Sequence, residues 1–499
     1  MRIAHLLKGT GAQLAAGDPS TNLTDLCDDS RVVTRGSAFI ARCGTQRDGR
    51  EFIEEAIQRG ASAVISESDP DHRDVAWVAA PRVDQVFTAR IAERFFDYPS
   101  RKLKLVGVTG TNGKTTTSFL VHHLLSSAAL RCGMLTTVSI DDGATCSPAA
   151  LTTPGSVELS RRLSAMVDHG CRAAVIEVSS HALDQGRVAA LGFDVGVFTN
   201  LTVDHLDYHH TMDRYAAAKA RLFMALPADG AAVVNADDPH AGHMVRDSSA
   251  RVVQCRVDGD PCGDGQCRAE VLEMGTQHTL TRMEGPWGHF TVKLPFVGAH
   301  NVANALQAAA AASVLLDRSQ TLGQDLESSP AVPGRLELVE TRNAAAAPTV
   351  LVDYAHTDDA LRNALSAVKP LTRGRLFVVF GCGGDRDTTK RPRMAETACR
   401  EADRIIITTD NPRGEDPLAI IGDVRRGVSV SASARTSVEP DRRTAIQKAI
   451  DEAGPGDIVL IAGKGHEDYQ IVGNRKHSFD DRIVAAEALA GKSPAAQTQ

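Results

Sequence analysis

The chain has 499 residues, which at about 150 residues per domain suggests about three domains. Hydrophobic residues make up 42% and charged residues 23% of the chain, a composition typical of globular proteins that excludes general disorder. The 55 lysine and arginine residues against 62 aspartate and glutamate residues give a net charge of −7, which argues against nucleic acid as the main partner.

The ten cysteines are scattered, as is typical of free thiols in a reducing compartment and not of a disulfide framework. The spacing of Cys255, Cys262 and Cys267 matches no common zinc pattern. The N-terminus lacks the apolar core of a signal peptide, and the most apolar window, residues 302–316, is too short and too polar for a membrane helix. We therefore expect a cytoplasmic protein with no membrane contact.

Residues 1–99 mix short apolar runs with helical stretches, and the step Tyr98-Pro99-Ser100 marks a boundary. Beyond it, short runs rich in β-branched residues predict buried parallel strands at 103–109, 173–178, 195–200 and 231–235. Helical stretches such as 115–127 and 157–169 separate these runs. Residues 268–294 alternate polar and apolar side chains and predict antiparallel hairpins.

A second boundary falls near 331–334. After it, four more strands are predicted at 350–353, 375–380, 404–409 and 457–461. Polar loops follow these strands, with the sequences DYAHTDD, GCGGDRD, TDNPRGED and AGKGHED. Because ligands of open α/β sheets lie at the carboxyl ends of the strands, we expect these loops to share a site.

The sharpest motif is TGTNGKTT at 109–116, which lies between a predicted strand and a predicted helix. The N–H groups of such a turn cradle phosphates, Lys114 would neutralise the β- and γ-phosphates, and the Thr115 hydroxyl would hold Mg²⁺. The spacing departs from the common phosphate-loop pattern, because Val108 stands where the first glycine would be. The context favours a nucleotide site over an incidental glycine turn, with ATP as the ligand. The predicted ATP-binding residues of the loop are Gly110, Thr111, Asn112, Gly113, Lys114, Thr115 and Thr116.

This loop resembles the phosphate loop of the Mur ligase family, the ATP-dependent ligases of peptidoglycan precursor assembly. Matching segments extend the resemblance along nearly the whole chain: DSR at 29–31, DGxxFI at 48–53, LTTP at 151–154, EVSSH at 177–181, TNLxxDHLD at 199–207, PGRLE at 333–337 and DYAHT at 353–357. DNPR at 410–413 and GKGHE at 463–467 resemble the branch of the family that adds the third residue of the peptide. So many motifs in one order make the resemblance specific.

The resemblance implies an α/β fold in three domains. These are a small α/β domain at 1–99 that binds the UDP-sugar, a central ATPase domain at 100–333 with a mostly parallel sheet, and a Rossmann-like domain at 334–499 that binds the amino acid. The implied substrates are ATP, UDP-N-acetylmuramoyl-L-alanyl-D-glutamate and meso-diaminopimelate, with Mg²⁺ as cofactor. ATP would phosphorylate the substrate carboxylate, and the incoming amine would displace phosphate from the acyl phosphate. We expect a monomer.

The resemblance places catalysis on Lys114, Glu177, His205 and Lys219. Glu177 and His205 would face the Mg²⁺, although a histidine ligand is unusual for this hard cation and rests on the resemblance alone. A capping or ion-paired glutamate and a structural histidine are the alternatives. Lys219 would carry an N6-carboxyl group and hold a second Mg²⁺; CO₂ adds only to a neutral amine, and the alternative is a solvated helix lysine.

Three further residues would complete the ATP site by resemblance: Asn304 at the adenine, Arg335 at a phosphate and Asp353 at the ribose. An exposed helix asparagine and surface ion pairs are the alternatives. The UDP-sugar-peptide would contact Ser30, Thr152, Thr153, Ser179, Gln185 and Arg187. Hydroxyl, amide and guanidinium groups suit a diphosphate and a carboxylate, but Ser and Thr are also ordinary cap and turn residues.

Arg413 is the residue on which amino-acid specificity depends, because it resembles the form of the motif that recognises meso-diaminopimelate. An arginine grips the distal carboxylate of that amino acid, which lysine lacks. The alternative is an ion pair of Arg413 with Glu415 or Asp416. The rest of the predicted pocket is Arg386, Asp410, Asn411, Pro412, Gly463 and Glu467, whose acidic groups would meet the ammonium groups.

Other functions stay open at this point. The same reaction with L-lysine is the nearest alternative, and a folate or cyanophycin-type ligase is disfavoured by the segments at 29–31 and 48–53. A catalytically silent nucleotide-binding regulator is disfavoured by the four intact catalytic positions. A DNA- or RNA-dependent ATPase is disfavoured by the acidic balance and by only 4% aromatic residues.

Overall fold

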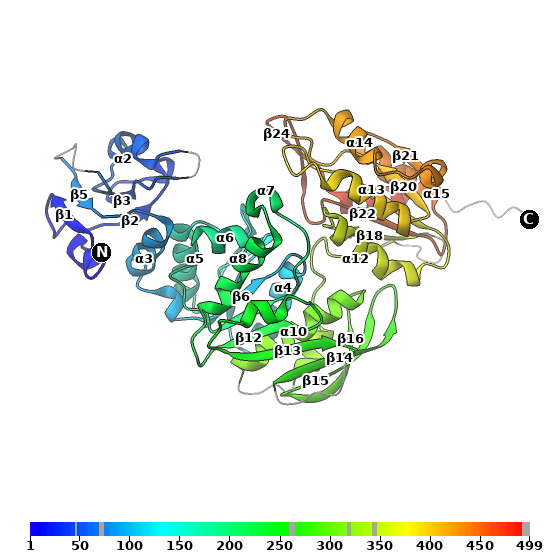
Figure 1. The fold of residues 1–499 in the computed structure, drawn as a ribbon, viewed down its shortest axis with the longest axis horizontal. Coiled ribbons are helices and arrows are strands. Elements are labelled where there is room, and N and C mark those ends of the chain that lie inside the picture. The colour runs from blue at the N-terminus through cyan, green and yellow to red at the C-terminus, as the bar shows by residue number, and fades with distance from the viewer. Residues whose placement is uncertain (45–46, 69–73, 259–264, 317–320, 342–346, 492–499) are drawn as a thin grey trace, which may run out of the picture.

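The computed structural model describes residues 1–44, 47–68, 74–258, 265–316, 321–341 and 347–491. These residues form sheets of five, eleven and six strands, each with its own helices, and one short hairpin. Figure 1 shows three bodies that follow one another along the chain, in blue, in cyan to green, and in yellow to red. The α/β class predicted from the sequence is therefore confirmed.

The first sheet is parallel except at one edge, where β1 runs antiparallel to β5. Its strand order is β1 (Gln13–Ala16), β5 (Ala76–Ala79), β4 (Ala63–Ser66), β3 (Ser37–Ile40) and β2 (Asp25–Cys27). Helices α1 (Ile3–Leu7) and α3 (Gln85–Phe95) contribute to one apolar cluster with this sheet, and α2 (Ile53–Gln58) contributes to another. The central strands are buried on both faces.

The eleven-stranded sheet has a parallel centre with antiparallel strands at both edges. Its strand order is β16 (Gly288–Leu294), β15 (Thr279–Gly285), β14 (Gln266–Met274), β13 (Arg251–Val257), β12 (Ala231–Asn235), β11 (Val195–Phe198), β6 (Lys104–Thr109), β10 (Ala173–Glu177), β7 (Cys132–Leu135), β8 (Ser139–Asp141) and β9 (Cys146–Pro148). The four parallel strands predicted between 103 and 235 are confirmed as β6, β10, β11 and β12. The predicted hairpins at 268–294 are β14 to β16, and β14 also pairs with β13 in parallel.

Helices cover both faces of this sheet, which explains the continuous apolar runs. Val106 and Val108 of β6 face one layer of helices, and Leu105 faces the other. The first layer holds α4 (Lys114–Ser127), α10 (Ala299–Leu315) and α11 (Leu322–Glu327). The second holds α5 (Ser156–Asp168), α6 (Ser180–Gln185), α8 (Met212–Met224) and α9 (Ala241–Val245), and the short α7 (Leu206–His209) precedes α8.

The six-stranded sheet is parallel apart from its edge strand β17. Its strand order is β17 (Glu337–Leu338), β18 (Thr349–Asp353), β22 (Ile458–Ala462), β19 (Leu376–Phe380), β20 (Arg404–Ile407) and β21 (Thr436–Val438). The four predicted strands are confirmed as β18, β19, β20 and β22. The covering helices are α12 (Asp358–Val368), α13 (Lys390–Glu401) and α14 (Pro417–Arg425) on one face, and α15 (Arg442–Glu452) and α16 (Asp481–Gly491) on the other. The hairpin consists of β23 (Tyr469–Val472) and β24 (Arg475–Ser478).

The fold bears on the predictions made for the cysteine cluster and for membrane helices. Cys255 and Cys267 lie opposite each other on β13 and β14 and are buried, whereas Cys262 lies outside the described residues. Within the described ranges, no helix combines the length and apolar character that crossing a membrane requires.

A fully buried ion pair holds the end of β22. Arg442 on α15 pairs with Asp481 on α16, with Nη2 and Oδ2 2.7 Å apart and neither side chain exposed. The same guanidinium donates to the carbonyl of Ala462, the last residue of β22. The pair therefore fixes the point at which the loop 463–467 begins.

We expect Asp481→Asn to destabilise the six-stranded domain by about 3 kcal/mol, because it leaves the Arg442 charge buried without a carboxylate. Calorimetry should show a lower unfolding midpoint. The matched control is Glu487→Gln on the same helix, whose ion pair with Arg443 is more than half exposed on both sides, and it should leave the midpoint nearly unchanged. Equal midpoints for the two variants would contradict this assignment.

Candidate active site

The phosphate loop 110–113 joins the carboxyl end of β6 to the N-terminus of α4. Gly113 has a φ of +82°, a backbone conformation that residues other than glycine rarely adopt. A Cβ at Gly113 would lie 2.4 Å from Oδ1 of Asn304, and one at Gly110 would lie 1.9 Å from Oγ1 of Thr199. The loop therefore requires glycine at both positions, although its spacing differs from the common pattern.

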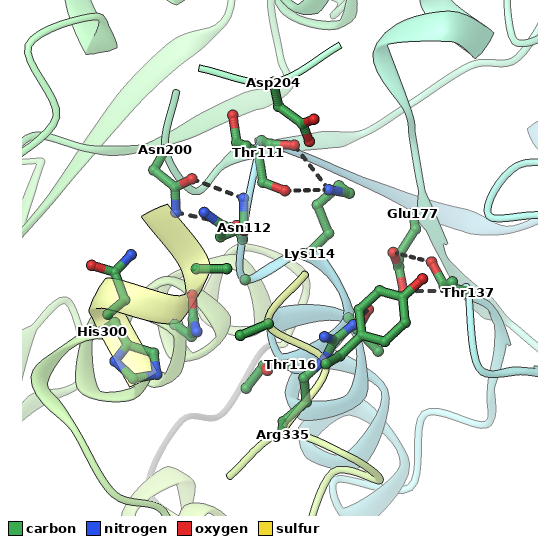
Figure 2. A pocket seen from close by; sticks show the side chains of 18 of the residues that line it. Thr111, Asn112, Lys114, Thr116, Thr137, Glu177, Asn200, Asp204, His300 and Arg335 are labelled. Atoms are coloured by element: carbon green, nitrogen blue, oxygen red, sulfur yellow. Dashed lines mark hydrogen bonds between the residues drawn. The ribbon is translucent and has the colours of Figure 1, made fainter. Parts of the chain in front are cut away.

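Lys114 folds back over this loop. Its Nζ donates to the carbonyl oxygens of Gly110, at 3.0 Å, and Thr111, at 2.7 Å. Burial lowers the pKa of Lys114, and the charges of Glu177 and Asp204 oppose that shift. Within the described chain its ammonium group forms no ion pair closer than 4.0 Å, so its charge is available to phosphate oxygens. Figure 2 shows the side chain at the centre of the cavity.

Glu177 ends β10 and is fully buried. Its carboxylate accepts hydrogen bonds from the backbone N–H of Thr137, at 3.1 Å, and from the Thr137 hydroxyl, at 3.0 Å. Both donors are neutral, and no described cation lies within ion-pairing distance. The alternative of an ion-paired glutamate is therefore wrong, and the carboxylate charge is suited to a bound cation.

His205 opens α7 with a φ of +53°. Its Nε2 lies 3.4 Å from Oδ2 of Asp204, and its ring lies edge-on to that of His181 with the ring centres 4.9 Å apart. Burial lowers the pKa of His205 to about 4, so the imidazole is neutral at neutral pH. A neutral imidazole retains the lone pair that a metal ion requires.

Lys219 on α8 is buried, with 1% of its surface exposed. Its Nζ donates to the carbonyl of Gly110 at 2.8 Å and lies 4.4 Å from the centre of the Tyr215 ring. Burial, reinforced by the charge of Lys114, lowers its pKa well below the ordinary value for lysine. The alternative of a solvated helix lysine is therefore wrong, and the neutral amine is the favoured form.

These side chains line one cavity of about 250 Å³ between the eleven-stranded and six-stranded domains. Thr115 lies in it, where its Oγ1 accepts a hydrogen bond from Nη2 of Arg335 at 2.9 Å. Asp353 accepts hydrogen bonds from the backbone N–H groups of Leu336 and Ala355, and burial raises its pKa against the effect of Arg335. Surface ion pairs are therefore the wrong interpretation of Arg335 and Asp353.

Asn304 on α10 also lines the cavity and is buried, so the alternative of an exposed helix asparagine is wrong. Its amide donates to Oδ1 of Asn301, and its oxygen accepts a bond from the Thr117 hydroxyl. The remaining loop residues predicted to bind ATP line the same cavity: Thr111, Asn112 and Thr116.

The loop also contacts the six-stranded domain directly. The side-chain amide of Asn112 donates to Oδ2 of Asp359 on α12 at 3.0 Å, and Oδ1 of Asn200 accepts the Asn112 backbone N–H at 2.9 Å. Asp359 is bound in addition by Arg362 of its own helix. Bonds from both domains therefore hold the phosphate loop.

Four of the six residues predicted to bind the UDP-sugar-peptide form one hydrogen-bonded group. Arg187 donates to the carbonyl of Thr153 and to the side chain of Gln185, and the Thr153 hydroxyl donates to that of Ser179. Ser179 also caps α6, so the alternative of a cap residue holds for it as well. Thr152 lines the first cavity.

Ser30 lies apart from this group, on the five-stranded domain. Its hydroxyl donates to Oε2 of Glu55 at 2.7 Å, and it does not line the first cavity.

Three of the residues predicted to bind the amino acid, Asp410, Asn411 and Glu467, lie around a buried lysine that sequence reasoning missed. Nζ of Lys464 lies 3.1 Å from Oδ1 of Asp410 and 3.8 Å from Oε2 of Glu467, and it donates to Oδ1 of Asn411 at 3.0 Å. Lys464 thus already compensates the acidic groups expected to meet substrate ammonium groups. Gly463, whose φ is +120°, lies beside Asp410.

Arg413 does not pair with either predicted neighbour, so that alternative is wrong. Glu415 pairs with the buried Arg391, and Asp416 caps α14. The Arg413 guanidinium instead donates from Nη1 to the carbonyl of Gly384 at 2.8 Å, and its backbone has a φ of +51°.

Arg386 and Pro412 lie around the same glycine turn. A Cβ at Gly383 would lie 2.9 Å from Nη1 of Arg413 and 4.0 Å from Cγ of Arg386, and a Cβ at Gly384 would lie 1.9 Å from the Pro412 carbonyl. The turn brings the two guanidinium-bearing side chains together. Of the four loops, only the one that begins at Asp353 lines the first cavity. It is in contact with another of the four, since the ring centres of Tyr354 and His466 lie 5.1 Å apart.

Sequence reasoning missed several residues that line the cavity: Thr137, Asp204, Tyr215, His300, Asn301, Tyr354 and His356. Tyr215 could have been found, because it lies one helical turn before Lys219. Its hydroxyl lies 3.1 Å from that of Thr111. No local signal pointed to Thr137, which is 40 positions from Glu177.

The phosphate loop at the carboxyl edge of a parallel sheet defines a nucleotide-binding α/β protein. Three family models match the chain: the Mur ligase family catalytic domain at residues 25–99, the Mur ligase middle domain at 108–312, and the Mur ligase glutamate ligase domain at 334–465. The chain belongs to the Mur ligase family.

Several known proteins align with this chain over most of their length. A UDP-N-acetylmuramoyl-L-alanyl-D-glutamate--2,6-diaminopimelate ligase from Synechococcus elongatus is 45% identical, over 99% of this chain and all of the relative. A ligase of the same name from Geobacillus kaustophilus is 43% identical, over 92% of this chain and 94% of the relative. A solved structure of such a ligase has 33% identity and a TM-score of 0.69, over 98% and 99% of the two chains. The fold also matches MurF ligase from Thermotoga maritima in complex with ADP, with 20% identity over 94% and 96% and a TM-score of 0.63.

We expect Gly113→Ala to weaken nucleotide binding about tenfold or more, because the new Cβ displaces the buried Asn304 amide and the backbone is strained. Equilibrium binding of a fluorescent ATP analogue measures the effect. The matched control is Gly242→Ala, at a glycine with no heavy atom within 4 Å of the added Cβ. Unchanged affinity in Gly113→Ala would show that the loop does not hold the nucleotide.

Proposed function

We propose that this protein is an ATP-dependent ligase that joins meso-diaminopimelate to the D-glutamate of UDP-N-acetylmuramoyl-L-alanyl-D-glutamate, releasing ADP and phosphate. Such a reaction belongs to peptidoglycan precursor synthesis and so to cell-wall growth, cell shape and division. The observation that carries the proposal is the cavity in which Lys114, Lys219 and Glu177 meet without a described ion-pair partner. The names of the relatives supply the substrates.

The first step forms the acyl phosphate. An oxygen of the substrate carboxylate attacks the γ-phosphorus of ATP, the bond from that phosphorus to the bridging oxygen breaks, and ADP leaves. Lys114 neutralises charge on the phosphates, and Arg335 approaches from the other side of the cavity. Both side chains line the cavity.

The donor set of the cavity fits Mg²⁺ in part. Glu177 supplies a buried carboxylate without a described cation, Thr115 a hydroxyl and His205 a neutral imidazole. The described residues contain no group of three His, Cys, Asp or Glu side chains arranged around a metal, so phosphate oxygens and water would complete the coordination. When bound, Mg²⁺ would neutralise the charge that develops on the transferred phosphoryl group.

We propose that Lys219 is carboxylated at Nζ. The nitrogen of the neutral amine attacks the carbon of CO₂ and loses a proton, which gives a carbamate anion. An anion would then replace a potential cation beside Lys114. This modification would let Lys219 take part in holding a second Mg²⁺.

In the second step the amine of the amino acid attacks the acyl carbon and phosphate leaves. We propose that Arg413, with Arg386, binds the distal carboxylate of meso-diaminopimelate. Asn411, Pro412 and Gly463 would shape the pocket. Asp410 and Glu467, held by Lys464, would orient the ammonium groups.

We further propose that residues 1–99, 100–333 and 334–499 are the three domains and bind the UDP-sugar, ATP and the amino acid respectively. Ser30 would serve the UDP-sugar, and the group Thr152, Thr153, Ser179, Gln185 and Arg187 its peptide end. Asn304 and Asp353 would bind the adenine and the ribose. We propose a monomer in the cytoplasm that contacts neither nucleic acid nor membrane.

Phosphate release tests the specificity. With ATP and the UDP-dipeptide substrate, we expect release with meso-diaminopimelate and little with L-lysine. Arg413→Ala should raise KM for meso-diaminopimelate roughly ten- to hundredfold, because a hydrogen bond to a charged group contributes about 1.5–3 kcal/mol. The matched control is Arg425→Ala, at an exposed arginine of the same domain.

Either of two outcomes would contradict this function. Preference for L-lysine would overturn the role of Arg413 in specificity, and the proposed ATP-dependent ligase reaction would stand. Absence of ADP formation with every amine, in protein that binds ATP, would favour the catalytically silent regulator.

A further inference from the structure

A second cavity, of about 550 Å³, lies at the junction between the five-stranded and eleven-stranded domains. It is bounded by the turn 9–11, the segment 81–94 with helix α3, the turn carrying Tyr98 and Arg101, and Ala190. None of its residues lines the first cavity or belongs to the proposed substrate sites. Its volume falls in the range of small-molecule sites, roughly 300–1,000 Å³.

The lining of this second cavity carries an excess of positive charge. Four arginines line it: Arg82, Arg90, Arg94 and Arg101. Only Arg82 forms an ion pair with a described carboxylate, that of Asp84, at 2.8 Å. The guanidinium groups of the other three have no described carboxylate within 4.0 Å.

The two acidic residues of the lining do not compensate these charges. The carboxylate of Asp84 is taken up by Arg82 and by the backbone N–H of Phe87, which it caps at 2.8 Å. Glu93 is buried and accepts hydrogen bonds from the hydroxyls of Ser100 and Ser160. Burial raises the pKa of Glu93 and disfavours its charged form, and the charge of Arg101 opposes this shift only in part.

Tyr98 holds two of the free guanidinium groups in place. Nε of Arg94 donates to the Tyr98 hydroxyl at 2.8 Å, and the guanidinium carbon of Arg101 lies 4.6 Å from the centre of the ring. Arg94 also reaches the carbonyl of Leu6 at 3.4 Å. These contacts hold Arg94 and Arg101 in place without pairing either guanidinium group with a carboxylate.

The backbone at this point is strained. Asp97 and Tyr98 have φ values of +60° and +52°, and neither is glycine. Such conformations cost of order 1–3 kcal/mol each and concentrate at functional sites. Tyr98 lines the cavity together with Phe87 and Ile91.

We propose that this cavity binds a small organic phosphate, an activity beyond the proposed ligase function. Arg90, Arg94 and Arg101, which all line the cavity, would bind the phosphate, because guanidinium groups donate charge-assisted hydrogen bonds to its terminal oxygens. The apolar side chains of the wall would contact the organic body, which the volume of the cavity accommodates. The residues that supply this surface are Val86, Phe87, Ile91 and Tyr98.

Calorimetric titration with phenyl phosphate tests the proposal. The full-length protein is first saturated with ADP and Mg²⁺, so that the phosphate loop is filled. We expect one site per chain, with weaker binding of inorganic phosphate, which lacks the body, and of phenol, which lacks the anion. The double variant Arg90→Ala, Arg101→Ala removes two exposed side chains and should weaken binding about tenfold or more.

The matched control is Arg246→Ala, at an exposed arginine outside both cavities, which should bind phenyl phosphate like the wild type. Ligase activity of each variant, measured in parallel, shows that the variants are folded. Absence of phenyl phosphate binding to the wild-type protein would overturn the proposal, as would equal affinity in the double variant. If inorganic phosphate bound as tightly as phenyl phosphate, the proposed apolar contact with the organic part of the ligand would be overturned.

Discussion

The arrangement of the active site depends on a single carbonyl group, that of Gly110. Both Lys114 and Lys219 donate to it, from helices on opposite faces of the central sheet. Two buried lysine amines this close do not both become protonated readily, because two ammonium charges would repel each other. The charge of Asp204 favours the protonated form of both lysines, but only Lys114 also has Glu177 nearby, whereas the charge of Lys114 acts against protonation of Lys219. Two identical side chains are thus given different protonation behaviour by their surroundings.

The fold places these groups by bringing the carboxyl ends of parallel strands to one edge. Glu177 ends β10, and the loop begins where β6 ends. Across the cavity, Arg335 and Asp353 come from the six-stranded domain, which Asp359 joins to the phosphate loop through Asn112. The loops 381–387, 409–416 and 462–468, which we propose bind the amino acid, lie at the corresponding edge of the six-stranded sheet. Rings of Tyr354 and His466, with centres 5.1 Å apart, connect the two groups of loops.

Several strands buried on both faces could be predicted from the sequence because their apolar runs are continuous, as in β6, β10 and β22. Strands β3 and β7 are equally buried and were missed. Strand β13 was missed because its residues alternate between buried and exposed and so lack the continuous apolar run of the central strands, and β9 because Cys146–Pro148 carries no strand signal. The phosphate loop and its flanking residues were recognisable from local sequence. Lys464 was not, since a lysine between glycines resembles an exposed loop residue, and its partner Asn411 lies 53 positions away. Arg413 shows the same limit, because the glutamate two positions on pairs with the distant Arg391 instead.

The state of Lys219 is the most direct test of this account. The protein is equilibrated with ¹³C-labelled CO₂ at neutral pH, and the ¹³C NMR spectrum is compared with that of Lys219→Arg. If Lys219 is carboxylated, we expect a carbamate signal in the wild-type protein that is absent from the variant. We also expect that the signal disappears as the pH falls and the amine is protonated, because only the neutral amine reacts with CO₂. Wild-type protein that is folded, binds ATP and gives no such signal would contradict the account.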